Sequence, residues 1–123
     1  MPISAVDVRD VADAHLAAAF LPTAKGRHIT SGSNSNLIEI ANILREHFGD
    51  GYPFPRRVLP KAMVWLVGPL FNKGLTREIV SKNVSIPFAV DNSKSIAELG
   101  ISYRPLKTSV TDMFQQLLDN GIV

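Results

Sequence analysis

The chain contains no cysteine, and its few excess positive charges are scattered rather than clustered. Without cysteine, disulfide bonds, thiolate nucleophiles and cysteine-ligated zinc are excluded, and the composition is compatible with a reducing compartment. The net charge is only +2 over 123 residues. Because nucleic-acid binding depends on a concentrated basic surface, no nucleic-acid partner is expected.

A hydrophobic segment long enough for a membrane is also missing. The most apolar stretch, Val58–Phe71, carries one charge, Lys61, and contains a Gly68-Pro69 pair. A membrane helix needs about 20 apolar residues, so this stretch is expected to form a buried helix and no membrane association is predicted. The first residues, Met1 to Ser4, show no signal-peptide pattern, and a cytoplasmic location is expected.

Motifs for phosphate binding and catalysis are absent as well. No Gly-x-Gly-x-x-Gly follows a strand pattern and no Gly-Lys-Ser/Thr occurs, so the chain is not expected to bind a dinucleotide by itself. Tyr103 and Lys107 have the Tyr-x-x-x-Lys spacing of reductases. However, Pro105 between them opposes the helix that would place both residues one turn apart. No catalytic residue is therefore assigned.

Metal ligands do not form a recognisable pattern. Asp7, Asp10 and Asp13 are evenly spaced, but the glycine turn and closing glutamate of a calcium loop are missing. Helix capping explains these aspartates better. The three histidines fall on different predicted elements without a ligand partner four residues on, so structural or exposed roles are expected and no metal site is predicted.

The pattern of apolar, capping and turn residues predicts a single, helix-rich domain. Expected N-caps are Asp10, Asn36 (in a capping box with Glu39) and Thr108. In the first half of the chain, we expect a strand over residues 3–8, a helix over 11–20, a strand over 27–30, a polar loop over 31–36 and a helix over 37–48. In the second half, we expect a helix from Pro60 that Gly68-Pro69 bends or ends, a short helix over 76–80 and an edge strand over 86–90. A helix over 92–99 stopped by Gly100 and a final helix that Asn120-Gly121 ends complete the chain.

Several side chains near the proline-rich loop after Gly49 are candidates for an apolar ligand pocket. They are Tyr52, Phe54, Met63, Trp65, Phe71 and Arg77. Plain core packing is the alternative. It is the preferred interpretation for Met63 and Trp65, whereas both interpretations stay open for the loop residues.

Taken together, ordered segments of the chain resemble one enzyme family. These segments are Val6–His15, Gly26–Ile29, Ile40–Phe48 and Asp91–Ile101. As a set that covers essentially the whole chain, they resemble the extended short-chain dehydrogenase/reductases, within the NAD-dependent epimerase/dehydratase superfamily. Further segments are similar to the branch of dihydroflavonol 4-reductase-like aldehyde and ketone reductases: Tyr52–Pro55, Leu59–Lys61, Trp65–Pro69 and Asp112–Phe114.

The resemblance implies a fragment rather than a complete enzyme. It covers the family's C-terminal third, so the expected fold is a helix-rich α/β fragment, the C-terminal substrate-binding part of an extended Rossmann-type reductase with a few short strands. The N-terminal NAD(P)-binding Rossmann part, with its glycine-rich turn and catalytic residues, would be missing. NAD(P) would then be bound by the parent protein and not by this chain alone.

The implied function is the binding of a small-molecule carbonyl substrate, of the dihydroflavonol, aldehyde or ketone type, for an NAD(P)-dependent oxidoreductase. The chain alone would be inactive. Ser4 stands where plant relatives carry a substrate-contacting glutamine, which adds Ser4 to the candidate substrate contacts. The alternative is a free-standing binding or dimerisation module without catalytic activity. Both predict self-association, because Val58–Phe71 and the alanine-rich first helix would expose apolar surface.

Overall fold

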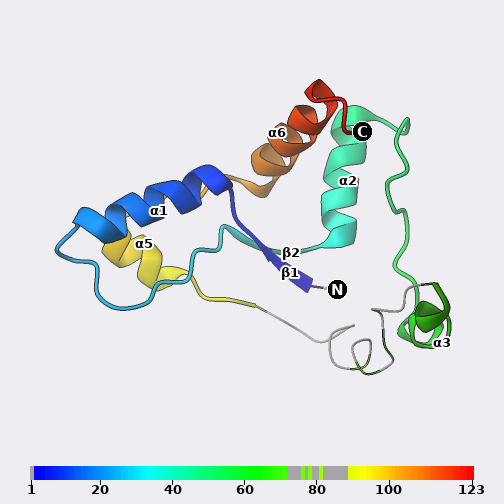
Figure 1. Cartoon of the computed structure of the whole chain (residues 1–123), viewed down its shortest axis with the longest axis horizontal. Coiled ribbons are helices and arrows are strands. Elements are labelled where there is room, and N and C mark those ends of the chain that lie inside the picture. Colours follow the sequence, from blue (N-terminus) through cyan, green and yellow to red (C-terminus); the bar gives the residue numbers. More distant parts are fainter. Residues whose placement is uncertain (1, 72–75, 77, 79–80, 82–88) are drawn as a thin grey trace.

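The structure is a computed structural model of the whole chain, and it describes residues 2–71, 76, 78, 81 and 89–123. Over these residues it has five helices and one two-stranded antiparallel sheet, which confirms a small, helix-rich α/β chain (Figure 1). The elements are β1 Pro2–Ala5, α1 Val8–Phe20, β2 Ser33–Asn36, α2 Leu37–Phe48, α3 Lys61–Phe71, α5 Ser93–Leu99 and α6 Leu106–Asp119. The expected helix over 76–80 and strand over 86–90 fall largely outside the described residues.

The sheet pairs the start of the chain with a polar segment. In the register of β1 and β2, Pro2 lies opposite Asn36 and Ala5 opposite Ser33. The expected loop over 31–36 is therefore wrong for residues 33–36. Serine and asparagine have poor strand propensity, and the pairing with β1 outweighs it. The expected strand over 27–30 is also wrong, since these residues have no regular secondary structure.

The side chain of Asn34 on β2 connects the sheet to Val90, much later in the chain. The carboxamide of Asn34 accepts a hydrogen bond from the backbone N–H of Val90 at 3.0 Å. The same carboxamide donates to the Val90 carbonyl at 3.1 Å. Asn34 thus holds the chain at Val90, just before α5, against β2.

Helix α1 begins three residues earlier than the sequence predicts, because Asp7 and not Asp10 is its N-cap. The Asp7 carboxylate accepts from the backbone N–H of Arg9 at 2.9 Å. Asp10 lies in the first turn, is 1% exposed, and accepts from the backbone N–H of Arg104 at 2.8 Å. Asp7 and Asp10 are both plausible N-caps from the sequence, and the contact of Asp10 with the distant Arg104 separates their roles.

The other helix ends agree only partly with the predictions. Asn36 caps α2 as expected, accepting from the N–H groups of Ile38 and Glu39. The Glu39 carboxylate instead accepts from the Ser35 hydroxyl at 2.7 Å, so the predicted capping box is only half formed. Gly100 ends α5 in the left-handed conformation, with φ 66°, as predicted.

The predicted start of α6 is wrong. Thr108 lies inside the helix, which begins at Leu106 with Pro105 as the N-cap residue. No side chain caps this end. The helix ends at Asp119, where Asn120-Gly121 was expected to end it.

The buried side chains form two separate clusters. One lies between α1 and α5 and consists of Ala14, Leu99 and Ile101. The other lies between α2 and α6 and is centred on Leu44 and Phe114, together with Val110 of α6. Figure 1 shows the two helix pairs side by side, with the sheet between them. The two helix pairs therefore do not share one core.

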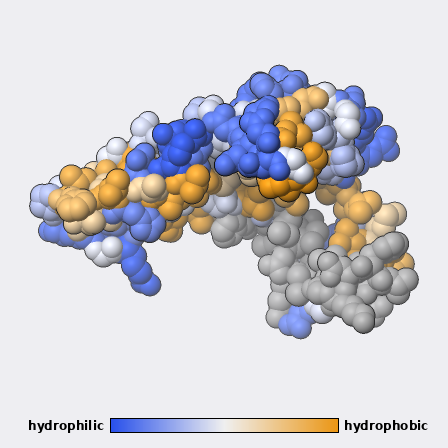
Figure 2. Space-filling view, turned by 45° about the horizontal axis from the view of Figure 1, so that its top comes forward, coloured by the Kyte–Doolittle hydropathy of each residue, from blue (hydrophilic) through white to orange (hydrophobic). Residues whose placement is uncertain are grey.

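Helix α3 lies apart from both clusters (Figure 1). It continues through Gly68-Pro69 to Phe71, so these two residues do not end it. Among its described side chains, Met63 is 50% and Leu66 63% exposed. It is therefore not the fully buried helix that its composition suggested, and it exposes apolar surface, as expected for a chain that lacks a covering partner. Figure 2 shows apolar surface over α3 and over the C-terminal end of α1. Among the described helices, none is long and apolar enough to cross a bilayer.

Candidate functional site

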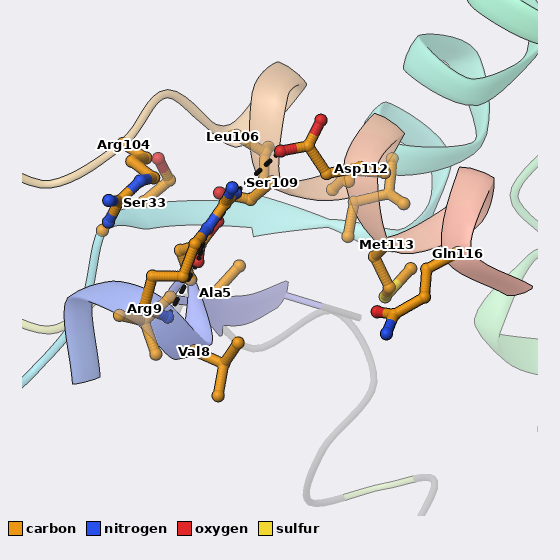
Figure 3. Close-up of a pocket in the computed structure, with 15 residues that line it drawn as sticks. Ala5, Val8, Arg9, Ser33, Arg104, Leu106, Ser109, Asp112, Met113 and Gln116 are labelled. Carbon is orange, nitrogen blue, oxygen red and sulfur yellow. Dashed lines mark hydrogen bonds and ion pairs between the residues drawn. The ribbon is translucent and has the colours of Figure 1, made fainter. Parts of the chain in front are cut away.

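A pocket of about 550 Å³ lies between β1, the first turn of α1 and α6 (Figure 3). Its apolar lining includes Ala5 of β1, Val8 of α1, and Leu106, Val110 and Met113 of α6. Val8 is 79% and Met113 50% exposed, so the apolar wall is open to solvent. The volume falls within the range of small-molecule sites, about 300–1,000 Å³.

An ion-pair network crosses one side of the pocket. The Arg9 guanidinium donates from Nε and Nη2 to the two carboxylate oxygens of Asp7, at 2.8 and 2.7 Å. Its Nη2 also donates to Asp112 of α6 at 2.8 Å (Figure 3). Arg9 therefore links the start of α1 to α6, although 103 residues separate it from Asp112.

The electrostatics of this network follow from its hydrogen bonds. Those that Arg9 donates hold the pKa of the Asp7 carboxyl well below its ordinary value of 3.8, against the opposing effect of burial. In return, the Asp7 carboxylate, with Asp112, raises the pKa of Arg9 above its ordinary value. Both groups are therefore charged at neutral pH.

A second arginine at the pocket is held in a similar way. Arg104 pairs through its guanidinium with Asp10, whose side chain is 2% exposed. The Arg104 backbone N–H donates to the other oxygen of the same carboxylate. Asp13 lies 3.9 Å from the guanidinium and is mostly exposed. Both arginines that line the pocket are therefore already neutralised by carboxylates.

Of the side chains predicted to contact substrate, those that the structure describes (Ser4, Tyr52, Phe54, Met63 and Trp65) do not line this pocket. Tyr52 and Phe54 pack against Phe114, with ring centroids 5.1 and 5.2 Å apart, and so belong to the α2–α6 cluster. The Ser4 hydroxyl lies 2.6 Å from the Ser31 hydroxyl. For Tyr52 and Phe54, the interpretation as core packing agrees with this placement.

The remaining predicted residues are associated with α3 or follow it. Met63, Trp65 and Phe71 lie on α3, where Trp65 is 41% exposed. Arg77 lies outside the described residues. Their contact with a substrate stays a prediction.

Sequence reasoning missed Arg9, Asp112 and Gln116, which line the pocket. For Asp112 and Gln116, their spacing along α6 could have indicated that they lie together. Gln116 lies four positions after Asp112 and three after Met113, so its side chain shares a helical face with each of them. No sequence signal connects that face to Arg9.

Tyr103 and Lys107 contact different partners. The Tyr103 hydroxyl lies 2.7 Å from the hydroxyl of the buried Ser95, and Tyr103 precedes α6 rather than lying on it. The Lys107 ammonium pairs with Glu46 at 3.4 Å. Among the described residues, no three side chains of histidine, aspartate or glutamate lie close enough together to hold a metal ion.

The turns that lead from a strand into a helix do not fit a dinucleotide. At the start of α1, the backbone N–H of Arg9 is taken by Asp7, and Asp10 adds a second carboxylate in the first turn. At the start of α2, Asn36 occupies the N–H groups of Ile38 and Glu39. A pyrophosphate needs free N–H groups and no adjacent negative charge, so neither turn suits it.

Comparisons with protein-family models and with curated proteins give no match to this chain.

Proposed function

We propose that this chain is the substrate-binding portion of an NAD(P)-dependent oxidoreductase that reduces a carbonyl compound. The observation that carries the proposal is the apolar pocket between β1, α1 and α6, whose volume suits a small organic molecule. The family resemblance supplies the reaction class. A separate nucleotide-binding domain would supply the nicotinamide and the proton donor, and this chain would hold the substrate.

The division of labour agrees with the chemistry of the pocket. Its two arginines are paired with carboxylates, Arg9 with Asp7 and Arg104 with Asp10. Among the described lining residues, no unpaired acid has a neighbour that would adjust its pKa for proton transfer. General acid catalysis needs a positioned group with a suitable pKa. The lining residues are suited to binding and orientation rather than to proton transfer.

The test is a titration of the ¹⁵N-labelled 123-residue chain with an aromatic ketone, 2-acetonaphthone, followed by NMR. Saturable shifts are expected at the amides of Ala5, Val8, Val110 and Met113, together with no consumption of NADPH. Shifts confined to the Tyr52–Phe54 loop, or no binding, would contradict the pocket assignment. NADPH-dependent reduction by the purified chain would contradict the need for a second domain.

A second candidate is a free-standing dimerisation module. It is favoured by the exposed apolar side chains of α3 and the residues before it, where Val58 is 66% and Leu59 57% exposed. A patch of this kind is usually covered by a partner. In this case sedimentation velocity would show a dimer without any carbonyl ligand, and the pocket would bind none of the ketones tested.

A further inference from the structure

The arginines that line the pocket are paired with carboxylates. Arg9 is bound by Asp7 and Asp112, and Arg104 is bound by Asp10, with Asp13 3.9 Å away. The two guanidinium groups are thus matched by four carboxylates. Among the described lining residues, no excess positive charge attracts an anionic ligand.

A ligand carboxylate in this pocket would meet two obstacles. A ligand carboxylate that approaches the Arg9 guanidinium comes close to Asp112, and also to the Asp7 carboxylate, whose side chain is 4% exposed. Placing a negative charge next to buried negative charges is costly unless a cation pairs with it. The pocket therefore disfavours carboxylates and phosphates.

Two neutral side chains of the lining also have hydrogen-bonding groups available. Gln116 and Ser33 line the pocket, and neither has a hydrogen bond from its side chain to the described residues. Gln116 follows Met113 by three positions, so both side chains lie on the same face of α6 (Figure 3). Its carboxamide offers both a donor and an acceptor next to the apolar wall.

We propose that the pocket selects uncharged ligands that carry a carbonyl or hydroxyl oxygen, and that Gln116 binds this oxygen. The inference rests on the proposed function and narrows its substrate class. Apolar contacts with Val8, Val110 and Met113 hold the hydrocarbon part of the ligand. The carboxamide of Gln116 fixes the orientation of the oxygen.

Three ligands of nearly equal shape test the charge preference: 2-acetonaphthone, 2-naphthoate and 2-ethylnaphthalene. Affinities for the full chain are measured by NMR titration at pH 7. The ketone is expected to bind at least about tenfold more tightly than the carboxylate. Equal or tighter binding of 2-naphthoate overturns the inference and leaves the pocket assignment standing. Failure of all three ligands to bind contradicts the proposed function itself.

Substitution of Gln116 tests its role in orientation. Gln116→Leu is expected to lower the affinity for the ketone about fivefold relative to 2-ethylnaphthalene, because one hydrogen bond is lost. Gln115→Leu is the matched control, since Gln115 is the neighbouring residue on α6, is exposed, and donates to Asp119 outside the pocket. An equal loss for both ligands, or the same loss in the control, overturns the role of Gln116.

Substitution of Asp112 tests the charge argument in the opposite direction. Asp112→Asn removes one of the two carboxylates bound to Arg9 and should raise the affinity for 2-naphthoate severalfold relative to the ketone. Asp119→Asn, further along α6 and outside the pocket, should not change this ratio. An unchanged ratio in Asp112→Asn overturns the claim that paired charges exclude anions.

Discussion

At the scale of single residues, Asp7 has two roles that its sequence position does not separate. Its carboxylate caps α1 through the Arg9 N–H and also binds the Arg9 guanidinium. Because the pKa of Asp7 is lowered on folding, its charge stabilises the native state. This contribution is complete above the ordinary pKa and is lost as the pH falls from about 3.8 toward the lower pKa of the folded state.

We therefore expect Asp7→Asn to destabilise the chain by about 2 kcal/mol at pH 7, since asparagine keeps the cap but not the charged hydrogen bonds. The difference from the wild type should stay constant down to about pH 5 and shrink below pH 4. Urea unfolding at a series of pH values measures it. Asp7→Ala should cost about 1 kcal/mol more because the cap is lost too. A difference that grows toward low pH would contradict the assignment.

Asp10 gives a second prediction at this scale. Asp10→Ala leaves the Arg104 N–H and guanidinium without their buried acceptor, and a loss of about 3 kcal/mol is expected. Asp13→Ala is the control, because Asp13 is 62% exposed at its side chain and lies 3.9 Å from the same guanidinium. Its effect should stay within about 0.5 kcal/mol. Equal urea midpoints for the two variants would show that burial of Asp10 is unimportant.

The sequence limits what can be predicted about these aspartates. The pattern before α1 correctly indicates a capped helix. The choice of Asp7 over Asp10 depends on Arg104, which lies 94 residues away from Asp10. Local capping preference contains no information about that contact, so the helix start was placed three residues late.

At the scale of elements, α2 and α6 form the best-defined unit. Phe114 is 6% exposed and its ring lies 4.8 Å from that of Phe48 on α2. The rings of Tyr52 and Phe54, from the loop after α2, pack against it as well. This aromatic cluster fixes the loop to the helix pair.

Phe114→Ala is expected to destabilise the chain by about 3–5 kcal/mol, since it opens a cavity among these rings. The tyrosine signal in near-UV circular dichroism should weaken, and the midpoint of urea unfolding should fall. Phe20→Ala is the matched control, because Phe20 lies at the end of α1 and is 81% exposed. A loss of the same size in both variants would argue against a core role for Phe114.

Helices of this chain are easier to predict than its strands. In α2, apolar residues at helical spacing and the Asn36 cap together determine both ends of the element. In β2 the four residues are serine and asparagine, which indicate a loop. The strand exists because β1 supplies backbone partners, and that pairing is a tertiary contact.

At the scale of the whole molecule, two small clusters replace a single core. The pocket is lined by residues from both ends of the sequence, together with Gly32, Ser33 and Ile40. Composition and periodicity predict each helix alone. They do not predict which faces meet across the sheet, and so the pocket and its arginine network were not foreseen.

The exposed apolar surface of α3 gives a prediction at this scale. The wild-type chain is expected to self-associate in sedimentation velocity, and the Met63→Ser/Leu66→Ser variant should shift toward the monomer. Ile122→Ser/Val123→Ser is a matched control, since these residues are comparably exposed at 67% and 57%. A strictly monomeric wild type at high concentration would contradict this prediction.

The paired hydrogen bonds between Asn34 and Val90 have a consequence for how this sequence can vary. A side-chain amide there imitates a peptide group, offering one donor and one acceptor to the same backbone residue. Aspartate lacks the donor, serine is too short to supply both groups, and glutamine places its amide one methylene further out. We therefore expect position 34 to stay asparagine among homologous chains, where it would serve as a fixed point for aligning β2 with the approach to α5.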